Sequence, residues 1–224
     1  MNIEAKDLTK IYGAGEGRVT ALDHASLEIA PGDFISIIGP SGSGKSTLLH
    51  LLSGLDRPTS GSLIYNGRDI YELRDKELSV FRRQRIGFIF QQFNLLPVLT
   101  ARENIIMPLL LDKKQPDEVY LNQLTELLGI RDRLTHLPHE LSGGQQQRTA
   151  IARALIAKPD IIFADEPTGN LDSQSGCEVM GLLKNIWRSM EKTLVIITHD
   201  KQIAQMAERQ FMIVDGVLSE VNAV

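Results

Sequence analysis

The sequence predicts an α/β fold built on a mainly parallel sheet, because short apolar segments alternate with helix-like runs. The apolar segments are rich in Ile, Phe and Val, as expected of strands buried on both faces, and they cover residues 34–38, 86–90, 160–164 and 193–197. The helix-like runs suit crossover connections between parallel strands and cover residues 46–52, 143–157 and 173–190. Since no repeat or low-complexity linker divides the 224 residues, we expect a single domain at 1–224.

Residues 92–158 depart from this alternation. They contain three helical patterns, at 101–111, 116–128 and 143–157, and no convincing strand. We therefore expect an inserted α-helical subdomain at 92–158, between two parts of the core at 1–91 and 159–224.

The two ends of the chain predict antiparallel pairing. Apolar residues partly alternate at 3–8 and 25–29, and Pro31 followed by Gly32 is a turn signal, so we expect an antiparallel β layer from the N-terminal region. Near the C-terminus, Asp215 and Gly216 stand between two apolar runs, which is typical of a β-hairpin.

The composition is that of an ordinary soluble globular protein, with 42% hydrophobic and 23% charged residues. A membrane-spanning helix needs ~20 mostly apolar residues, whereas the longest apolar stretch, 105–111, is interrupted by Pro108. The first residues also lack the basic and apolar regions of a signal peptide. We therefore expect a chain that does not cross a bilayer and stays in the cytoplasm.

The charge argues against a nucleic-acid-binding protein, and the cysteine content argues against a protein that is held by disulfides or by a cysteine-cluster metal site. The net charge of -4 makes nucleic acid an unexpected partner, because proteins that bind it usually present a basic face to the phosphates. The one basic cluster, Arg82, Arg83 and Arg85, is interpreted as a solvated face or a helix end. The single cysteine, Cys177, excludes a disulfide framework and a cysteine-cluster metal site, and we interpret it as a plain helix residue.

A glycine-rich loop follows the apolar segment 34–38 and precedes a helix-like run. Its residues are Gly39, Pro40, Ser41, Gly42, Ser43, Gly44, Lys45, Ser46 and Thr47. Glycines let the backbone N–H groups curl around a phosphate, Lys45 adds a charge near the β and γ phosphates, and Ser46 offers a hydroxyl to Mg²⁺. The strand–loop–helix setting favours this interpretation over a simple glycine-rich turn. The loop predicts a P-loop NTPase with a RecA-like core that binds ATP.

Two adjacent carboxylates, Asp165 and Glu166, end the apolar run that starts at residue 160. Their side chains point to opposite sides if the strand geometry continues through both residues. Asp165 is then suited to supporting the Mg²⁺ shell through water, and Glu166 to orienting and deprotonating the attacking water. The alternative is that the pair caps the next helix.

A second glycine-rich helix start suggests a second anion site in the same chain. Its residues are Leu141, Ser142, Gly143, Gly144 and Gln145. One ATP does not need two such sites from one subunit. At this point the chain resembles the ABC ATPases, whose LSGGQ signature is this pentapeptide. The resemblance implies that the segment binds the ATP of a second copy of the chain; the alternative is a helix that is merely capped by Ser142.

Four further residues match ABC motifs in order along the chain. Tyr12 resembles the aromatic residue that stacks on adenine, or it is a core tyrosine at a strand end. Gln91 resembles the glutamine that touches Mg²⁺ and senses the membrane partner, or it is a linker residue. Asp172 resembles part of the loop that crosses the dimer interface, or it is a helix cap. His199 resembles the histidine that contacts the γ-phosphate, and by itself it would be a structural histidine.

Segments 87–97 and 163–173 narrow the resemblance to one branch. They are similar to the ATPase subunits of macrolide exporters, lipoprotein-releasing complexes, antimicrobial-peptide resistance transporters and the cell-division system. The resemblance implies hydrolysis of ATP to ADP and phosphate by a homodimer, with Lys45, Glu166 and His199 as catalytic residues. It also implies that the dimer drives an integral membrane permease for export or extraction of a peptide, lipoprotein or drug-like substrate.

The permease is expected to dock near residues 91–97, on the cytoplasmic face of the membrane. The apolar side chains of Phe93, Leu95 and Leu96 favour an interface there, although they could instead form the core between the two subdomains. Two rival functions use the same motifs, and the sequence leaves only the first of them open. One is a mechanical ATPase without a transported substrate; the other is an ABC ATPase of DNA repair, whose coiled-coil or zinc insertions 224 residues leave no room for.

Overall fold

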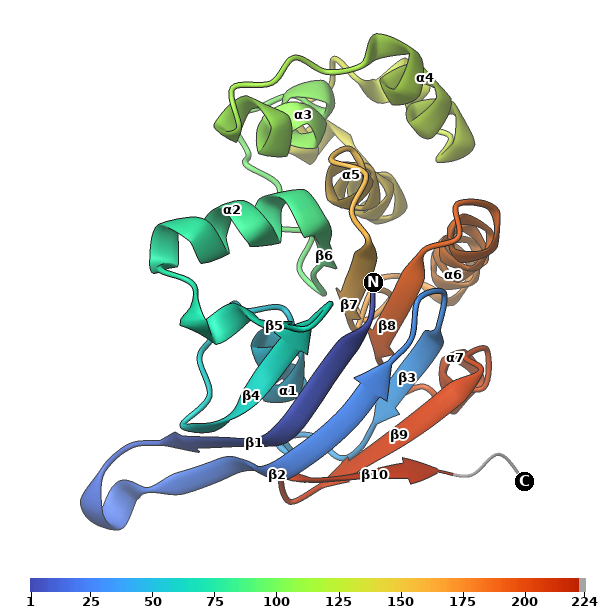
Figure 1. Cartoon of the computed structure of the whole chain (residues 1–224). Coiled ribbons are helices and arrows are strands. Elements are labelled where there is room, and N and C mark those ends of the chain that lie inside the picture. The colour runs from blue at the N-terminus through green and yellow to red at the C-terminus, as the bar shows by residue number, and fades with distance from the viewer. Residues whose placement is uncertain (222–224) are drawn as a thin grey trace.

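The fold contains two β-sheets with helices between and around them (Figure 1). The computed structural model describes residues 1–221, without the side chain of Glu16. The larger sheet has the strand order β10-β9-β3-β8-β7-β6, and the smaller has the order β2-β1-β4-β5.

Five strands of the larger sheet run parallel. They are β3 (Phe34–Ile38), β6 (Ile86–Ile89), β7 (Ile161–Asp165), β8 (Thr193–Ile197) and β9 (Arg209–Val214). β10 (Val217–Val221) pairs with β9 in the antiparallel direction through the turn at Asp215 and Gly216. The parallel sheet and the C-terminal hairpin are therefore confirmed, and the four predicted strands match the observed ones to within one residue at each end.

The smaller sheet is antiparallel throughout. It consists of β1 (Ile3–Tyr12), β2 (Val19–Ile29), β4 (Ser60–Tyr65) and β5 (Arg68–Asp69). The predicted N-terminal layer is confirmed, although β1 and β2 are longer than the segments 3–8 and 25–29. The sequence analysis missed β4 and β5, because β4 begins with the small residues 60–62 and β5 has two residues.

The helices follow the capping signals of the sequence. They are α1 (Lys45–Leu52), α2 (Asp75–Arg85), α3 (Ala101–Leu111), α4 (Glu118–Leu127), α5 (Gly143–Leu155), α6 (Ser173–Ser189) and α7 (Lys201–Ala204), with short 3-10 turns at Gly15–Gly17, Ile70–Glu72, Arg131–Arg133 and Pro138–Glu140. Thr100 caps α3 and accepts a hydrogen bond from the Glu103 N–H. Within residues 1–221, no helix has the length and apolar character needed to cross a membrane.

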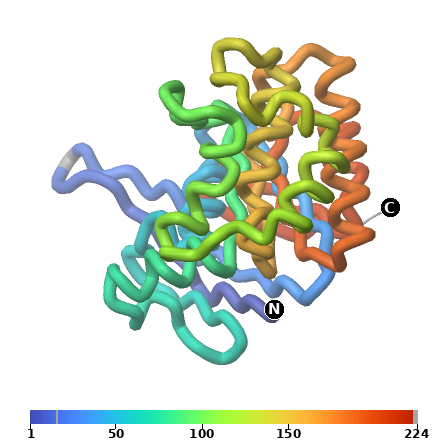
Figure 2. The backbone as a smooth tube through the Cα atoms, turned by 90° about the horizontal axis from the view of Figure 1, so that it is seen from above, coloured from blue at the N-terminus to red at the C-terminus, as the bar shows by residue number. Residues whose placement is uncertain are grey.

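Between β6 and β7 the chain forms helices and loops and no strand. Figure 2, which views the molecule from above, shows these green and yellow segments in front of the strands. They are not separated from the sheet, because one hydrophobic cluster contains Ile105 of α3, Leu124 of α4 and Ile151 of α5 together with Phe34 and Ile162. A second cluster lies between the two sheets and includes α1.

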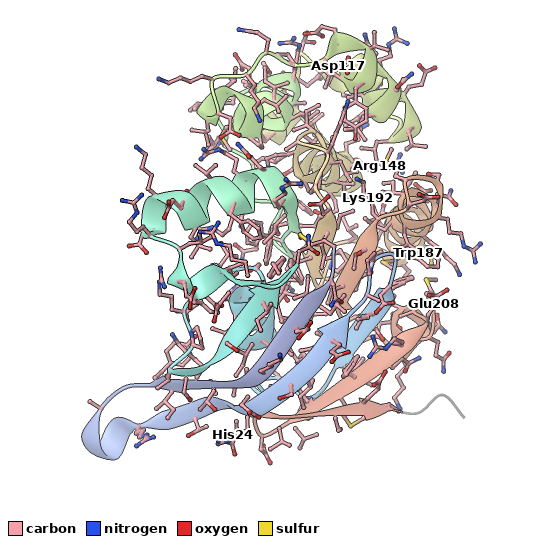
Figure 3. All side chains as sticks on the ribbon, in the orientation of Figure 1. His24, Asp117, Arg148, Trp187, Lys192 and Glu208 are labelled. Carbon is pink, nitrogen blue, oxygen red and sulfur yellow. The ribbon has the colours of Figure 1, made fainter. Side chains whose placement is uncertain are left out.

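α6 packs against this core next to the start of β3. The Trp187 indole (Figure 3) donates a hydrogen bond of 2.7 Å to the Gly32 carbonyl, and its ring centroid lies 5.3 Å from that of Phe34. This contact fixes α6 against the start of β3. The same helix begins at Ser173, eight positions after the last residue of β7, so its placement bears directly on the loop between them.

Candidate active site

A pocket of about 550 Å³ lies at the carboxyl edge of the parallel strands. Its walls come from the glycine-rich loop after β3 and from Gln91, Asp165, Glu166 and His199. Each of these residues follows or ends a strand of the same sheet, and parallel strands bring their carboxyl ends to one edge. The structure thus brings together most of the residues that the sequence singled out.

The loop 39–44 adopts a conformation that a side chain would block. Gly44 has φ +105°, and a Cβ atom there would lie 2.2 Å from the Ala21 carbonyl oxygen. α1 begins at the next residue, Lys45, so the positive end of a helix faces the pocket. This arrangement of free backbone N–H groups and a helix N-terminus is suited to an anion such as a phosphate.

The Lys45 ammonium group lies against the loop. It donates hydrogen bonds to the carbonyl oxygens of Gly39 at 2.9 Å and of Pro40 at 2.7 Å. The side chain is nearly buried, with 8% of the residue exposed, and among the described residues its hydrogen bonds go to these two carbonyl oxygens and not to a carboxylate. A phosphate in the loop would therefore meet a cation that the chain has not neutralised.

Ser46 and Asp165 lie next to each other in the pocket. The Ser46 hydroxyl donates to Asp165 Oδ1 at 3.4 Å. Burial raises the pKa of the Asp165 carboxyl above its ordinary value, and the bond from Ser46 opposes this in part. The two oxygen groups are hard ligands of the kind that Mg²⁺ prefers, and a cation there would stabilise the ionised carboxylate.

Glu166 does not continue the strand. Its φ is +43°, in the left-handed region that non-glycine residues rarely adopt. The two carboxylates were expected to point to opposite sides only if the strand continued through both residues, and it does not. Asp165 and Glu166 instead line the same pocket. Neither caps the next helix, because α6 is capped by Asp172.

His199 faces Glu166 across the pocket. Its Nδ1 atom lies 3.2 Å from Glu166 Oε1. His199 is largely exposed. It lies two residues after the end of β8, and Thr198 stands between them. A histidine that is exposed at a pocket rim and contacts a carboxylate is not a satisfied core residue, so the structural alternative for His199 does not hold.

Gln91 reaches the pocket from β6 through a close contact with the loop after β7. Asn170 Nδ2 donates to the Gln91 carbonyl at 3.0 Å. A Cβ atom on Gly169 would lie 2.8 Å from Gln91 Nε2, so the glutamine side chain packs directly against this glycine and would have to shift if a larger residue stood there. Gln91 is thus more than a linker residue, because it joins the two loops.

Tyr12 ends β1 and is 42% exposed, so it is not a core tyrosine. Its hydroxyl donates to Asp56 Oδ2 at 2.8 Å, and Lys10 Nζ lies 4.9 Å from the ring centroid. Burial and the bond to Asp56 raise the pKa of the phenol. The sequence analysis missed Asp56 and Lys10, which fix the orientation of this ring; Tyr12 itself does not line the pocket of the phosphate loop.

The second glycine-rich helix start does not line this pocket. Ser142 caps α5 by accepting a hydrogen bond from the Gln145 N–H at 3.3 Å, and Gln145 Oε1 accepts from the Ser142 N–H at 3.0 Å. Asp172 likewise caps α6: the Ser175 N–H donates to it at 3.0 Å, which lowers the pKa of its carboxyl. Both capping alternatives are correct as local structure, and neither segment meets the phosphate loop within the chain.

Three buried polar residues were missed by the sequence analysis. Asn104 of α3 and Gln147 and Arg153 of α5 are all less than one-tenth exposed. Arg153 donates to the carbonyl oxygens of Phe93 and Asn94, and burial lowers the pKa of its guanidinium. The signal that could have found them is a polar side chain on the apolar face of a helix.

A phosphate-binding loop, two carboxylates and a histidine at the edge of a parallel sheet define a P-loop nucleoside triphosphatase. Comparison with known families narrows this class. A family model described as ABC transporter matches residues 22–169. The chain belongs to this family, and it is an ABC-type ATPase and an ATP-binding subunit of an ABC transporter.

Relatives and solved structures agree with this assignment. The chain is 48% identical to an uncharacterized ABC transporter ATP-binding protein, MJ1508, of Methanocaldococcus jannaschii, over 98% of both chains. It is 48% identical to the lipoprotein-releasing system ATP-binding protein LolD of Geobacter metallireducens over 96% of both chains. It is also 48% identical to the macrolide export ATP-binding/permease protein MacB of Marinobacter nauticus, over 97% of this chain and 34% of the relative.

The structural comparison supports the same fold. A dimeric structure of the ATP-binding cassette MJ0796 in a post-hydrolysis state, bound to ADP and Pi, superposes with a TM-score of 0.88 at 42% identity. The match covers 99% of this chain and 100% of that one. The P-loop core, the antiparallel layer and the helices of the predicted fold class are therefore confirmed.

The geometry of Gly44 predicts a loss of ATP binding in Gly44→Ala. Left-handed strain alone costs about 1–3 kcal/mol, which is roughly 5- to 150-fold in an equilibrium constant, and the contact with the Ala21 carbonyl adds to it. Gly32→Ala is the matched control, because Gly32 has φ +87° and nothing within 4 Å of a Cβ atom. We expect equilibrium dialysis to show weaker ATP binding for Gly44→Ala only. Equal affinities in both variants would contradict the role assigned to this close approach.

Proposed function

We propose that this chain binds and hydrolyses ATP as one half of a homodimer that drives a separate membrane permease. The proposal rests on the observation that the two glycine-rich segments of the chain lie apart from each other. The phosphate loop, Asp165, Glu166 and His199 share one pocket, whereas the glycine-rich start of α5 lies outside it. Relatives named for lipoprotein release and macrolide export support export or extraction of a lipoprotein, peptide or drug-like substrate.

The nucleotide is proposed to lie with its phosphates in the loop 39–47 and its adenine against Tyr12. Lys10 makes a cation–π contact with the tyrosine ring, and 42% of the residue is exposed, so the residue has accessible surface for an adenine to contact. Lys45 would stabilise the charge on the transferred phosphoryl group, which is the main task in phosphoryl transfer.

A magnesium ion fits the oxygen groups of this pocket. Ser46, Asp165 and Gln91 would hold it, and the ion would neutralise charge on the phosphates. Within the described residues, no group of three or more His, Cys, Asp or Glu side chains forms a metal site. This is consistent with an ion that takes its other ligands from water and from the phosphates of ATP.

Glu166 is proposed as the base that orients and deprotonates the attacking water. It lies beside Asp165 but is not bonded to Ser46, so its carboxylate is free to face the water. His199, 3.2 Å from Glu166 Oε1, is proposed to hold that carboxylate and to contact the γ-phosphate. The two residues together set the position of the water relative to the phosphate.

The proposed base predicts that Glu166→Gln keeps ATP binding and lowers hydrolysis by roughly 10² to 10⁴, the usual effect of removing a general base. Glu191→Gln is a matched control, because Glu191 has a similar φ of +49° and is exposed after α6. Phosphate release and ATP binding should be measured on the same samples. Turnover near that of the unchanged protein in Glu166→Gln would refute the assignment.

The start of α5 is proposed to complete the site of a second copy. Residues 141–145 present a helix N-terminus and two glycines that do not line the pocket of the phosphate loop. Asp172 caps α6, and Gly144 lies near Ser175 in the first turn of that helix. The dimeric form of the related cassette MJ0796 supports this arrangement. Because each site would take groups from both chains, a two-fold dimer would hold two ATP molecules.

This arrangement predicts that the ATPase rate per subunit rises with protein concentration and then levels, since monomers lack half of each site. The rate should be measured by phosphate release over a dilution series, with light scattering on the same samples. A rate per subunit that stays constant down to concentrations at which only monomers scatter would exclude a shared site.

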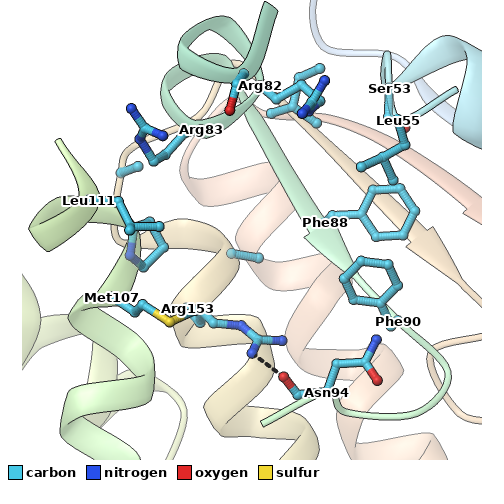
Figure 4. Close-up of a pocket in the computed structure, with 15 residues that line it drawn as sticks. Ser53, Leu55, Arg82, Arg83, Phe88, Phe90, Asn94, Met107, Leu111 and Arg153 are labelled. Atoms are coloured by element: carbon cyan, nitrogen blue, oxygen red, sulfur yellow. Dashed lines mark hydrogen bonds between the residues drawn. The ribbon is translucent and has the colours of Figure 1, made fainter. Parts of the chain in front are cut away.

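The permease is proposed to dock on an apolar groove beside the segment 91–97. The groove has a volume of about 400 Å³ and lies between β6, the C-terminal half of α3 and α5 (Figure 4). Phe88, Phe90 and Met107 give it an apolar wall, and Arg82 of α2 and the buried Arg153 of α5 add charged groups to its lining. A groove of this kind suits a helix that is apolar on one side and polar on the other.

The loop next to this groove is held in an exposed form. Asn104 accepts from the Leu96 N–H at 2.8 Å and donates to the carbonyl oxygens of Leu96, Leu99 and Thr100. As a result Leu96 is 43% exposed and Val98 is 81% exposed. Phe93 and Leu95 are half-buried, so the core alternative fits them better than it fits Leu96.

Leu96→Glu should leave folding and basal ATPase of the isolated subunit nearly unchanged, because the new carboxylate stays in water. It should weaken co-purification with the permease and any stimulation by it. Val119→Glu is the control, since Val119 is 67% exposed on α4 and lies outside both the segment 91–97 and the groove. A sharp fall in melting temperature with normal binding of the folded fraction would show that Leu96 is a core residue and not a docking residue.

The proposal places the chain at the cytoplasmic face of the membrane, attached through the permease. It also treats residues 92–158 as a helical subdomain that carries both the docking groove and the start of α5. Residues 1–91 and 159–224, of which 222–224 lie outside the described residues, then form the core that holds the nucleotide. No nucleic acid partner is proposed, in keeping with the net charge of -4.

A further inference from the structure

Gln147 is a buried polar residue that none of the roles above uses. It lies on α5, two residues after Gln145, and none of its surface is exposed. Its Nε2 atom donates a hydrogen bond of 2.6 Å to the Pro167 carbonyl. Pro167 immediately follows Glu166, so this bond connects the helix that starts at 143 to the turn that carries the proposed base.

The direction of this bond follows from electrostatics. Turning the amide over would place two carbonyl-type oxygens within 2.6 Å of each other, which is repulsive, so the N–H₂ group must face Pro167. The Oε1 atom of Gln147 is then buried, and it has no hydrogen-bond partner among the described residues. An unpaired buried acceptor lowers stability, so a methionine of similar length would suit this core position better. The glutamine is therefore explained by the bond it makes and not by packing.

The turn that contains Glu166 and Pro167 is strained, and hydrogen bonds from several elements stabilise it. The Glu166 N–H donates to the Ile197 carbonyl at 3.0 Å, and the Gly169 N–H donates to the Glu166 carbonyl at 2.9 Å. These two bonds come from β8 and from the turn itself. The bond from Gln147 comes from α5, and a left-handed residue such as Glu166 keeps its conformation only while its surroundings enforce it.

We propose that Gln147 is a positioning residue that holds Glu166 in place and couples it to the start of α5. A phosphate bound by residues 142–145 of one copy would act on α5, and the Gln147 bond would transmit that contact to the Glu166 of the same copy. The two sites of a dimer would thereby be linked through each chain. This inference rests on the proposed function, because it assumes that Glu166 is the base.

The test is the steady-state kinetics of Gln147→Met in the full-length chain. Methionine keeps the length and burial of the side chain and removes the donor to Pro167. We expect kcat to fall on the order of tenfold to a hundredfold, as when a reacting group is displaced by a small distance, while KM for ATP and the melting temperature stay near those of the unchanged protein. Thr125→Val is the control: Thr125 is fully buried on α4 and bonds the Leu121 carbonyl, away from the site.

A second measurement separates positioning from general structure. In a Glu166→Gln background, single-turnover hydrolysis should not fall further when Gln147→Met is added, because Gln147 acts through Glu166. An unchanged kcat in Gln147→Met, or an equal further loss in the Glu166→Gln background, overturns the inference. To allow for partial unfolding, rates are divided by the amount of ATP bound in each sample. If Glu166→Gln alone keeps its turnover, the proposed function fails, which is a different result from failure of the Gln147 inference.

Discussion

The parallel pairing of β3, β8, β7 and β6 is the constraint on which the rest of the structure depends. Parallel strands end at the same edge, so the phosphate loop, Glu166, His199 and Gln91 arrive at one pocket although they are spread over the chain. The pairing holds because the strands are buried on both faces and join two hydrophobic clusters. The crossover connections must then lie on the faces of the sheet, which places α1 on one side and α5 and α6 on the other.

Local strain at this edge is offset by contacts from other elements. Gly44 removes a clash with Ala21, and Glu166 is kept in a left-handed conformation by the bonds of its turn. The polar side chains of α5 reinforce two loops, since Gln147 bonds the segment after Glu166 and Arg153 bonds Phe93 and Asn94. α5 therefore contacts both the turn that carries the proposed base, Glu166, and the proposed docking loop.

The sequence predicted the elements whose signal is local. Strand 34–38 and helix 101–111 were found with their observed bounds, because an apolar run marks the strand and a helical pattern marks the helix. The phosphate loop and the two carboxylates were also found, since their residue types specify the chemistry. β4 and β5 were missed because β4 begins with three small residues and β5 is an edge strand of two residues, so neither carries much of an alternating pattern.

The remaining features depend on partners that are distant in sequence. The left-handed φ of Glu166 cannot be inferred from its residue type, so the orientation of the two carboxylates could only be stated conditionally. Gln147 meets Pro167 across 20 residues, and Arg153 meets Phe93 across 60. Buried polar residues of this kind look like surface residues until the tertiary structure shows what covers them.

The central claim is that residues 141–145 of one copy act at the phosphate loop of another, and cross-linking between two populations tests it most directly. One population carries Ser41→Cys and the other Ser142→Cys, both with Cys177→Ser and Glu166→Gln so that no other thiol is present and ATP is retained. The account predicts that ATP produces disulfide-linked dimers when the populations are mixed and few when either is alone. If ATP produces no linked dimers in the mixture, or links only like with like, the site is not shared in this way.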